Sequence, residues 1–309
     1  MKILVTGAGG FFGKNLVSLL ASNYKTIPAY SSSFKENKQD LAFEIRPDTD
    51  WEEILQDIDI VIHLAARAHI MNKKERNSFD YDSINNLSSI NLAKYASESF
   101  VKKFIFISTV KVSGEHSPPH TSLNTSDINR NLDPYSKSKF DAEEGIKKVF
   151  SNSNTDLIII RPPLIYGPGV KGNFRLLINL IKSQIPTPLG SINNKRSLVS
   201  TYNFIDFIEH CINFDKKIND TFFVSDGDDI STPELIKLIA NSLNKKPRLF
   251  NFNIGVLKVF SRIIGKEDQI NRLSDNLVID IDKNYRLLGW KPKFAVSDSL
   301  NKMFLVEQE

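Results

Sequence analysis

Three glycines spaced three residues apart follow the first apolar run of the chain. Gly7, Gly10 and Gly13 lie between a predicted strand over residues 2–5 and a predicted helix over residues 11–22. The first two permit a tight turn and close backbone approach, and Gly13 permits the helix to pack closely on the strand. The helix N-terminus then offers N–H donors and partial positive charge to a pyrophosphate. This placement predicts a cradle for a dinucleotide.

Short runs rich in Val, Ile and Phe alternate with helical stretches through the first half of the chain. Such runs, apolar on both faces, are typical of parallel strands covered by helices on both sides. We therefore expect an α/β fold, a Rossmann-type doubly wound parallel sheet. The predicted strands are 2–5, 26–30, 58–63, 103–107 and 156–160, and the predicted helices are 11–22, 50–57, 81–100 and 135–150.

The pattern changes after residue 165. Gly167, Pro168 and Gly169 interrupt the chain, and shorter mixed elements follow, including predicted helices over 174–184 and 232–243. We predict a dinucleotide-binding domain over 1–165 and a smaller substrate-binding portion over 166–309, with some of its segments returning to the sheet.

Composition narrows the classes of molecule that the chain can be expected to bind. Forty basic residues face 36 acidic ones, so the net charge is only +4, and no compact basic block predicts nucleic acid binding. The chain has a single cysteine, Cys211, and no metal-ligand spacing, which indicates a reducing cytoplasm and predicts no metal. No apolar run of 18 residues occurs, so we expect neither export nor a membrane partner. The slight basic surplus suits a few arginines that bind one small anion.

Tyr135 and Lys139 lie four residues apart on one face of a predicted helix. A nearby ammonium lowers the pKa of a phenol, so the pair predicts proton exchange with an alcohol or carbonyl near neutral pH. We predict that both residues are catalytic.

These motifs together resemble the short-chain dehydrogenase/reductase family in its extended form. The resemblance rests on Gly-x-x-Gly-x-x-Gly after threonine, on Tyr-x-x-x-Lys, and on the stretches 63–66, 85–93 and 161–169. It implies that Thr109, 26 residues before Tyr135, is the third catalytic residue, with Ser108 beside it. It also implies a homodimer formed through the helices that begin near residues 85 and 135.

The end of the second predicted strand bears on the cofactor. NAD-binding members hold the adenosine ribose with an acidic residue there, but residues 29–35 read AYSSSFK. Hydroxyls and a lysine can bind a 2′-phosphate, so we favour NADP(H), with NAD(H) possible and a solvated serine loop as the plain alternative. The cofactor-binding candidates are Gly7, Gly10, Phe11, Phe12, Gly13, Ser31, Ser32, Lys35, Glu44, Ile45, Leu64, Ala65, Ala66, Asn85, Ile107, Tyr135, Lys139 and Pro162.

The second half resembles the family branch that acts on nucleotide-activated sugars. By this resemblance Arg196 and Asn173 contact the diphosphate of a UDP-sugar, and Arg272 is a plausible second arginine. Ser197 and Ser200 depart from the aspartate and histidine usual at those positions. The substrate-binding candidates are Ser108, Thr109, Lys111, Asn173, Arg196 and Arg272.

Two reactions remain open. The related dehydratases carry Asp-Glu where this chain has Val110-Lys111, so the missing carboxylates argue against dehydration. Longer stretches resemble a bacterial subgroup, the UDP-N-acetyl-quinovosamine dehydrogenases of surface polysaccharide biosynthesis. That resemblance implies NADPH-dependent reduction of the 4-keto group of a UDP-4-keto-6-deoxy-N-acetylhexosamine. The alternative is an NAD-dependent 4-epimerase of UDP-hexoses or UDP-N-acetylhexosamines.

Overall fold

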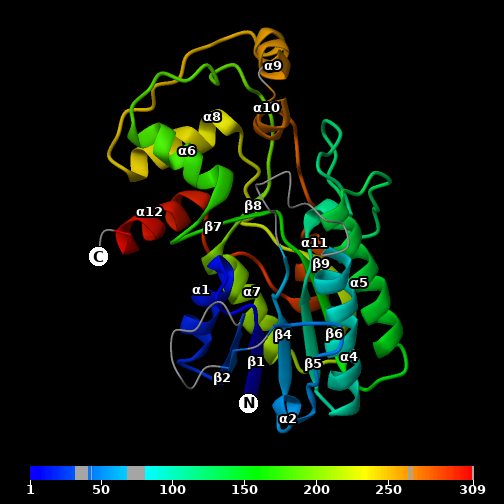
Figure 1. Ribbon diagram of the computed structural model, residues 1–309. Helices are drawn as coiled ribbons and strands as arrows, with labels where there is room; N and C mark the ends of the chain where they lie inside the picture. Colours follow the sequence, from blue (N-terminus) through cyan, green and yellow to red (C-terminus); the bar gives the residue numbers. More distant parts are fainter. Residues whose placement is uncertain (32–40, 43, 68–80, 264, 266, 308–309) are drawn as a thin grey trace.

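Strands that are apolar on both faces need cover on both sides, and the chain builds that arrangement. The computed structural model describes all residues except 32–40, 43, 68–80, 264, 266 and 308–309. Seven parallel strands form one sheet in the order β3-β2-β1-β4-β5-β6-β9 (Figure 1). They are β1 (Lys2–Thr6), β2 (Lys25–Tyr30), β3 (Leu41–Ala42), β4 (Ile60–His63), β5 (Lys103–Ile107), β6 (Asp156–Arg161) and β9 (Asn219–Phe223).

Alternate residues of each strand enter different cores, as the pleat requires. Ile3 and Val5 of β1 pack with α1 (Phe11–Leu20) and α7 (Thr201–Asn213) on one face. Leu4 points to the other face, which three helices cover (Figure 1). These are α2 (Glu52–Leu55), α4 (Ser88–Glu98) and α5 (Pro134–Phe150).

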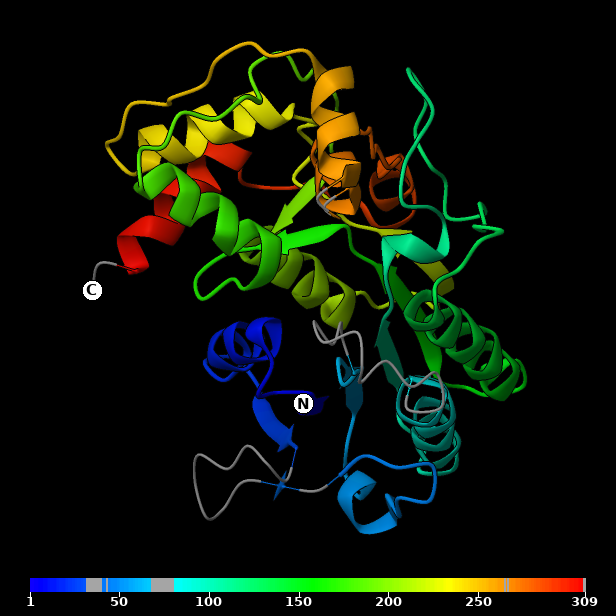
Figure 2. The ribbon, with the colours of Figure 1, turned by 45° about the horizontal axis from the view of Figure 1, so that its top comes forward.

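Much of the second half of the chain forms a cap above the carboxyl edge of the sheet (Figure 2). Its two short parallel strands, β7 (Leu164–Tyr166) and β8 (Leu198–Ser200), lie beneath a third apolar core. The helices of that core are α6 (Gly172–Lys182), α8 (Thr232–Ser242) and α12 (Val296–Val306). The remaining helices are α9 (Ile254–Ile263), α10 (Glu267–Ser274), α11 (Asp282–Leu288), the π-helical η2 (Asp82–Leu87) and the 3-10 turn η3 (Val110–Val112).

A buried carboxylate ties the cap to the sheet. Asp226, just after β9, accepts hydrogen bonds from the Tyr166 hydroxyl at 2.6 Å, from Asn203 Nδ2 at 2.7 Å and from the Ser200 backbone N–H at 2.9 Å. Because these donors belong to β7, β8 and α7, the two parts of the molecule are held in a fixed relation.

The predicted doubly wound parallel sheet is confirmed, and all five predicted strands are present within one or two residues. Two helices differ from expectation. The one predicted over 81–100 begins with a π-helical turn before α4, and the one over 50–57 is only four residues long. No helix within the described ranges is both long and apolar enough to cross a bilayer.

Candidate active site

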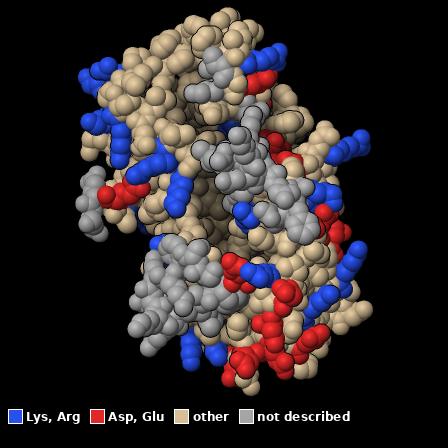
Figure 3. Space-filling view, viewed as in Figure 1, with Lys and Arg blue, Asp and Glu red and all other residues tan. Residues whose placement is uncertain are grey.

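The predicted functional segments meet at the carboxyl edge of the sheet. Residues 7–10 follow β1, 64–66 follow β4, 108–109 follow β5, and Pro162 follows β6. The strand order reverses between β1 and β4, and a crevice at such a switch point is where open α/β sheets bind ligands. In the view of Figure 1, the surface of the molecule is hollowed near its centre, between the sheet and the cap (Figure 3).

The glycine turn fits a dinucleotide phosphate. Gly7 has φ +73°, and a Cβ there would stand 2.7 Å from the Ala65 backbone nitrogen. A Cβ at Gly13 would stand 2.3 Å from the Gly7 carbonyl oxygen, so both positions exclude a side chain. Gly10 caps α1 without a side-chain hydrogen bond, and the first turn holds no acidic residue. The helix therefore presents its N–H groups and dipole to an anion.

The other cofactor candidates differ in what they can offer. Leu64, Ala65 and Ala66 are half-buried beside the turn. Phe12 and Ile107 are buried, and the Phe12 ring stacks on Phe204 at 4.3 Å. Their side chains therefore belong to the core, and only their backbone can face a ligand. Phe11 is likewise packed against the core, and the buried Pro162 uses its carbonyl to accept from the Val110 N–H at 3.0 Å.

The residues predicted to bind the adenosine follow the strands β2 and β3. Ser31 is exposed, whereas Ser32 and Lys35 lie outside the described residues. Glu44 forms an exposed ion pair with Arg46, and Ile45 packs against the core beneath α4. None of the described residues here distinguishes NAD from NADP.

Asn85 has a supporting position. It is buried in η2 and binds the backbone of Arg67, accepting from its N–H at 2.7 Å. Its Nδ2 donates to the Ser138 hydroxyl at 3.0 Å, and that hydroxyl donates to the Tyr135 carbonyl at 2.8 Å. Asn85 thus connects the segment after β4 to the first turn of α5.

His63 joins two strand ends and a helix. It is fully buried, with Nδ1 2.6 Å from the Thr6 hydroxyl and Nε2 2.8 Å from the Ser89 hydroxyl. Burial, with a smaller effect of the Lys139 charge, lowers the pKa of His63 to about 3. The imidazole is therefore neutral at physiological pH, and its role is structural.

Tyr135 opens the helix α5, whose N-terminus Asp133 caps by accepting from the Ser136 N–H at 2.7 Å. Burial, then the charges of Asp133 and Tyr81, raise the pKa of Tyr135 to about 12. The prediction that Lys139 lowers this pKa is therefore wrong for the protein without a bound ligand. The reason is geometric, because Lys139 Nζ donates to the Ile107 carbonyl at 2.7 Å and lies 4.3 Å from the Phe106 ring centre.

Lys139 is itself perturbed. Burial lowers its pKa to about 7, against the opposing effect of Glu143 one turn further along α5. Its side-chain amine can therefore gain or lose a proton near neutral pH, which is a property of groups poised for proton transfer.

A buried ion pair that the motifs did not predict lies behind this lysine. Glu143 binds Arg161 through both oxygens, at 2.9 Å and 2.6 Å, and accepts from the Ser108 hydroxyl at 2.5 Å. Arg161 also donates to the Ser113 hydroxyl and to the Thr125 carbonyl, each at 2.8 Å. Ser108 is thus engaged inside the protein, which does not support its predicted contact with substrate. The sequence feature that could have indicated this buried pair is Glu143, which lies one helical turn after Lys139 and so on the same face of the helix.

Thr109 and Lys111 form the turn after β5. Thr109 is half-buried, and its hydroxyl oxygen caps η3. Lys111 Nζ lies 2.7 Å from Asp133 and 2.5 Å from Glu115. Hydrogen bonds from Lys111 and Ser136 outweigh burial and lower the pKa of Asp133 to about 2. The ammonium of Lys111 is therefore held by two carboxylates and fastens the turn to the N-terminus of α5.

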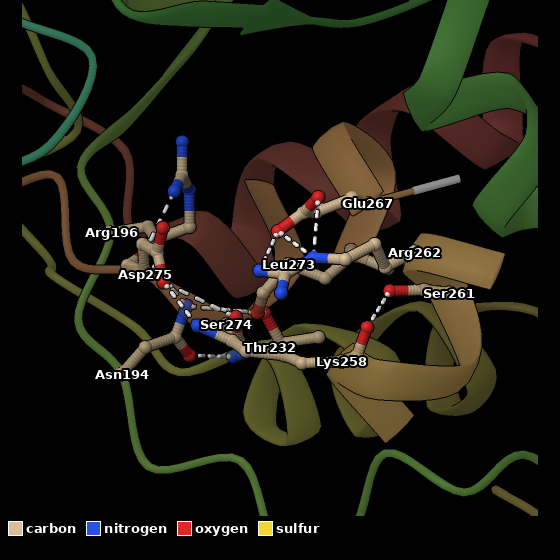
Figure 4. Close-up of polar contacts among 10 residues, drawn as sticks. All are labelled: Asn194, Arg196, Thr232, Lys258, Ser261, Arg262, Glu267, Leu273, Ser274 and Asp275. Carbon is tan, nitrogen blue, oxygen red and sulfur yellow. Dashed lines mark hydrogen bonds and ion pairs between the residues drawn. The ribbon is translucent and has the colours of Figure 1, made fainter. Parts of the chain in front are cut away.

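A cavity of about 280 Å³ in the cap brings together the three other substrate candidates. Asn173, Arg196 and Arg272 all line it, beside apolar residues such as Leu164 and Leu198. Arg196 donates to the Asp275 carbonyl at 2.8 Å, and the rest of its guanidinium points away from that contact (Figure 4). Burial and then the neighbouring Arg272 lower the pKa of Arg196, while Asp275 opposes them. Two cations that disfavour each other across a cavity suit an anionic ligand.

Comparison with known proteins agrees with this geometry. Residues 3–223 match the pattern of the NAD dependent epimerase/dehydratase family. The chain belongs to this family. It is 42% identical, over 97% of its length and 94% of the relative's, to a UDP-glucose 4-epimerase of Vibrio cholerae.

A second relative and a solved structure extend the comparison. The chain is 27% identical to the N-acetyl-alpha-D-glucosaminyl-diphospho-ditrans,octacis-undecaprenol 4-epimerase of Escherichia coli O157:H7, over 86% of this chain and 82% of the relative. The fold matches UDP-glucuronic acid 4-epimerase of Bacillus cereus in complex with NAD with a TM-score of 0.77 at 24% identity, covering 98% and 95% of the two chains.

Proposed function

We propose that this member of the family is a 4-epimerase of UDP-hexoses or UDP-N-acetylhexosamines that uses NAD. The observation that carries the proposal is the 42% identity, over nearly the whole chain, to a UDP-glucose 4-epimerase. NAD is supported by the B. cereus enzyme of the same fold, which was solved with it. The comparisons therefore favour the epimerase alternative over net reduction, and they lend no support to a preference for NADP.

The roles follow from the carboxyl edge of the sheet. Tyr135 would take the proton of the sugar C4 hydroxyl and return it, and Thr109 would hydrogen-bond the same oxygen and orient it. When bound in the crevice, the nicotinamide would accept and return the C4 hydride, and its positive oxidised form would favour the tyrosine phenolate. Lys139 would hold the reacting end of the site through the Ile107 carbonyl.

The cap would hold the substrate by its anionic end. Arg196 and Arg272 would bind the diphosphate, and Asn173 would add a neutral hydrogen bond. A 4-epimerase must present both faces of C4 to the nicotinamide in turn. It therefore needs to bind the diphosphate tightly while the hexose remains free to rotate. The homodimer through α4 and α5 remains a prediction.

One observation favours a second candidate, the 4-ketoreductase. The residues after β2 include no acid at positions 31–35, and the sequence resembles the UDP-N-acetyl-quinovosamine dehydrogenases. This candidate would use the same Tyr135, Lys139 and Thr109 with NADPH as the net hydride donor.

The two candidates separate in one pair of assays on the purified full chain. The first supplies UDP-glucose or UDP-N-acetylglucosamine without added cofactor and follows the C4 epimer by chromatography. The second supplies UDP-4-keto-6-deoxy-N-acetylglucosamine with NADPH or NADH and follows nicotinamide absorbance. We expect epimer formation in the first and no stoichiometric loss of NADPH in the second. The reverse result would establish the reductase.

A further inference from the structure

The outward face of α9 is apolar and uncovered. Val256, Val259, Phe260 and Ile263 recur at the three- and four-residue spacing of one helix face and are 55–77% exposed. The side of α9 that bears Ile254 and Leu257 packs against the cap core. A surface helix normally presents polar residues to water, so a continuous apolar outer face indicates that something covers it.

The chain entering this helix adds two exposed aromatic rings. Phe250 and Phe252 are 46% and 40% exposed, and their ring centres lie 6.4 Å apart in an edge-to-face arrangement. With Val256, Val259, Phe260 and Ile263 they make up what we name the α9 face. It lies at the end of the cap furthest from the sheet (Figures 1 and 2).

The charge of the surrounding segment is one-sided. Residues 235–266 hold seven lysines and arginines and no acidic residue. That excess is larger than the net charge of +4 of the whole chain, so the rest of the molecule is net acidic. Lys245, Lys246 and Arg248 are exposed before the aromatic pair, whereas Lys258 and Arg262 pair with Asp275 and Glu267. In Figure 3 acidic side chains gather mainly at the lower right, and the upper end is mostly tan and blue.

We propose that the α9 face docks on an anionic lipid bilayer, with the helix lying in the plane of the membrane surface. A short helix with exposed Phe, Val and Ile on one face and cations alongside is the form that interfacial helices take. Basic residues beside it are attracted to acidic headgroups. A second copy fits less well, because a symmetric pair would bring two basic segments together. This contact concerns the surface of a membrane, which the lack of a spanning segment does not address.

Docking there has a consequence for the pocket. The helix α10 follows α9 directly, and its Gln269, Arg272 and Leu273 line the cavity of the cap. Thr232 of α8 fixes this segment by donating to the Leu273 carbonyl at 2.6 Å (Figure 4). A bilayer bound at the α9 face would therefore lie beside the segment that supplies one wall of the pocket.

Sedimentation with vesicles tests the proposal on the full chain. One set of vesicles contains phosphatidylglycerol in phosphatidylcholine, and the other contains phosphatidylcholine alone. We expect the chain to bind the anionic set at least about tenfold more tightly, with an affinity that falls as salt rises. The variant V259E/F260E should lose about tenfold or more in affinity, and K245Q/K246Q/R248Q should lose most of the preference for anionic lipid. Phe100, 87% exposed on the turn between α4 and β5, provides the matched control F100E, which should bind as the wild type does.

Several results would overturn the proposal. They are no binding to anionic vesicles, equal binding to both sets without salt dependence, or full binding by V259E/F260E. Self-association of the wild type without lipid, abolished by V259E/F260E, would assign the face to a second copy instead. Thermal unfolding checks that each variant folds. If a variant does not fold, the preference of the wild type for anionic over neutral vesicles still tests the proposal. None of these readouts depends on epimerase activity, so the proposed function stands or falls separately.

Discussion

At the carboxyl edge of the sheet, Lys139, Glu143 and Arg161 are almost completely buried, whereas in the cap Arg196 and Arg272 line an open cavity. The first group is fixed by protein partners before any ligand arrives, since each charge has a hydrogen-bonding partner in the core. The second contains two like charges that an incoming anion would satisfy. The difference is between an edge of the sheet whose charges are already paired, which we name the catalytic edge after the role proposed above, and a cap that still has charge to offer a ligand. It also predicts which substitutions act on turnover, which on stability and which on affinity.

The largest effect should come from the catalytic edge. Tyr135→Phe removes the proton-transferring hydroxyl, so kcat should fall about 10²–10⁴-fold, while the unfolding midpoint and dinucleotide binding change little. Steady-state kinetics with thermal unfolding measure this. Tyr285→Phe, on the exposed surface of α11, is the matched control and should be neutral. A Tyr135→Phe enzyme with more than half of wild-type kcat would remove the tyrosine from the mechanism.

Breaking the buried pair should be the largest stability effect. Glu143→Leu leaves the guanidinium of Arg161 without its carboxylate, so the free energy of unfolding should fall by about 3–5 kcal/mol. The double variant E143L/R161L should recover much of that loss, because it no longer buries an unpaired charge. Urea unfolding measures both. Glu267→Gln, in the exposed pair with Arg262, is the control and should change stability little. Equal losses from the single and double variants would contradict the assignment.

His63 should make the protein sensitive to acid. Its pKa is about 3 when folded and near 6.5 when unfolded, so between these values the unfolded chain binds the extra proton. Stability is therefore lost as the pH falls below 6.5, by about 2 kcal/mol at pH 5 from this residue.

The measurement is the pH dependence of urea unfolding. His63→Gln should be less stable at pH 7 but should show a shallower decline toward pH 5, and the exposed His120→Gln should decline like the wild type. A variant at position 63 with an unchanged slope would show that the acid sensitivity arises elsewhere.

The cap arginines should act on affinity. Arg196→Met removes a charged donor to the diphosphate, so KM for the UDP-sugar should rise about 10–100-fold, with kcat within about threefold. Arg272→Met, at a more exposed position, should raise KM less. The surface substitution Arg286→Met is the control. A loss confined to kcat would instead assign Arg196 to turnover and contradict its predicted role in binding the diphosphate.

The smallest effect concerns the turn after β5, beside the N-terminus of α5. Lys111→Met leaves Asp133 without its ammonium partner, so the negative charge nearest Tyr135 is less compensated and the pKa of the phenol rises further. The groups facing the phenol are Asp133, Tyr81 and, one turn away, Lys139. Because Tyr135 must lose its proton to act as the base, we expect kcat to fall about threefold to tenfold, with the rising, acid limb of the pH profile moved to higher pH. Lys111→Arg should restore both. A rise in KM alone would instead make Lys111 a substrate contact.

Most of the catalytic edge could be predicted from the sequence, because local patterns specify it. The glycine turn, the buried strands and the Tyr135–Lys139 spacing each report on a short segment, and the parallel sheet then brings the strand ends together. Long-range effects were missed. The direction of Lys139 toward the Ile107 carbonyl and the raised pKa of Tyr135 depend on β5 and on burial, which the spacing alone does not contain.

The cap was less predictable for a related reason. Its pocket joins residues from position 164 to position 273, and no local periodicity links them. Asn173, Arg196 and Arg272 were proposed from family resemblance, and the structure brings all three to one cavity. The apolar outer face of α9 was missed, because an apolar helical run in the sequence does not reveal which of its sides the fold leaves uncovered.

Tracing the hydrogen at C4 separates epimerisation from net reduction in one experiment. Full-length protein is incubated with UDP-N-acetylglucosamine or UDP-glucose carrying deuterium at C4, with no added reductant, and the product is examined by mass spectrometry and NMR. We expect the C4 epimer with deuterium kept at C4 and no net change in nicotinamide absorbance. Failure to form either epimer, together with NADPH-dependent reduction of a 4-keto sugar nucleotide, would contradict it.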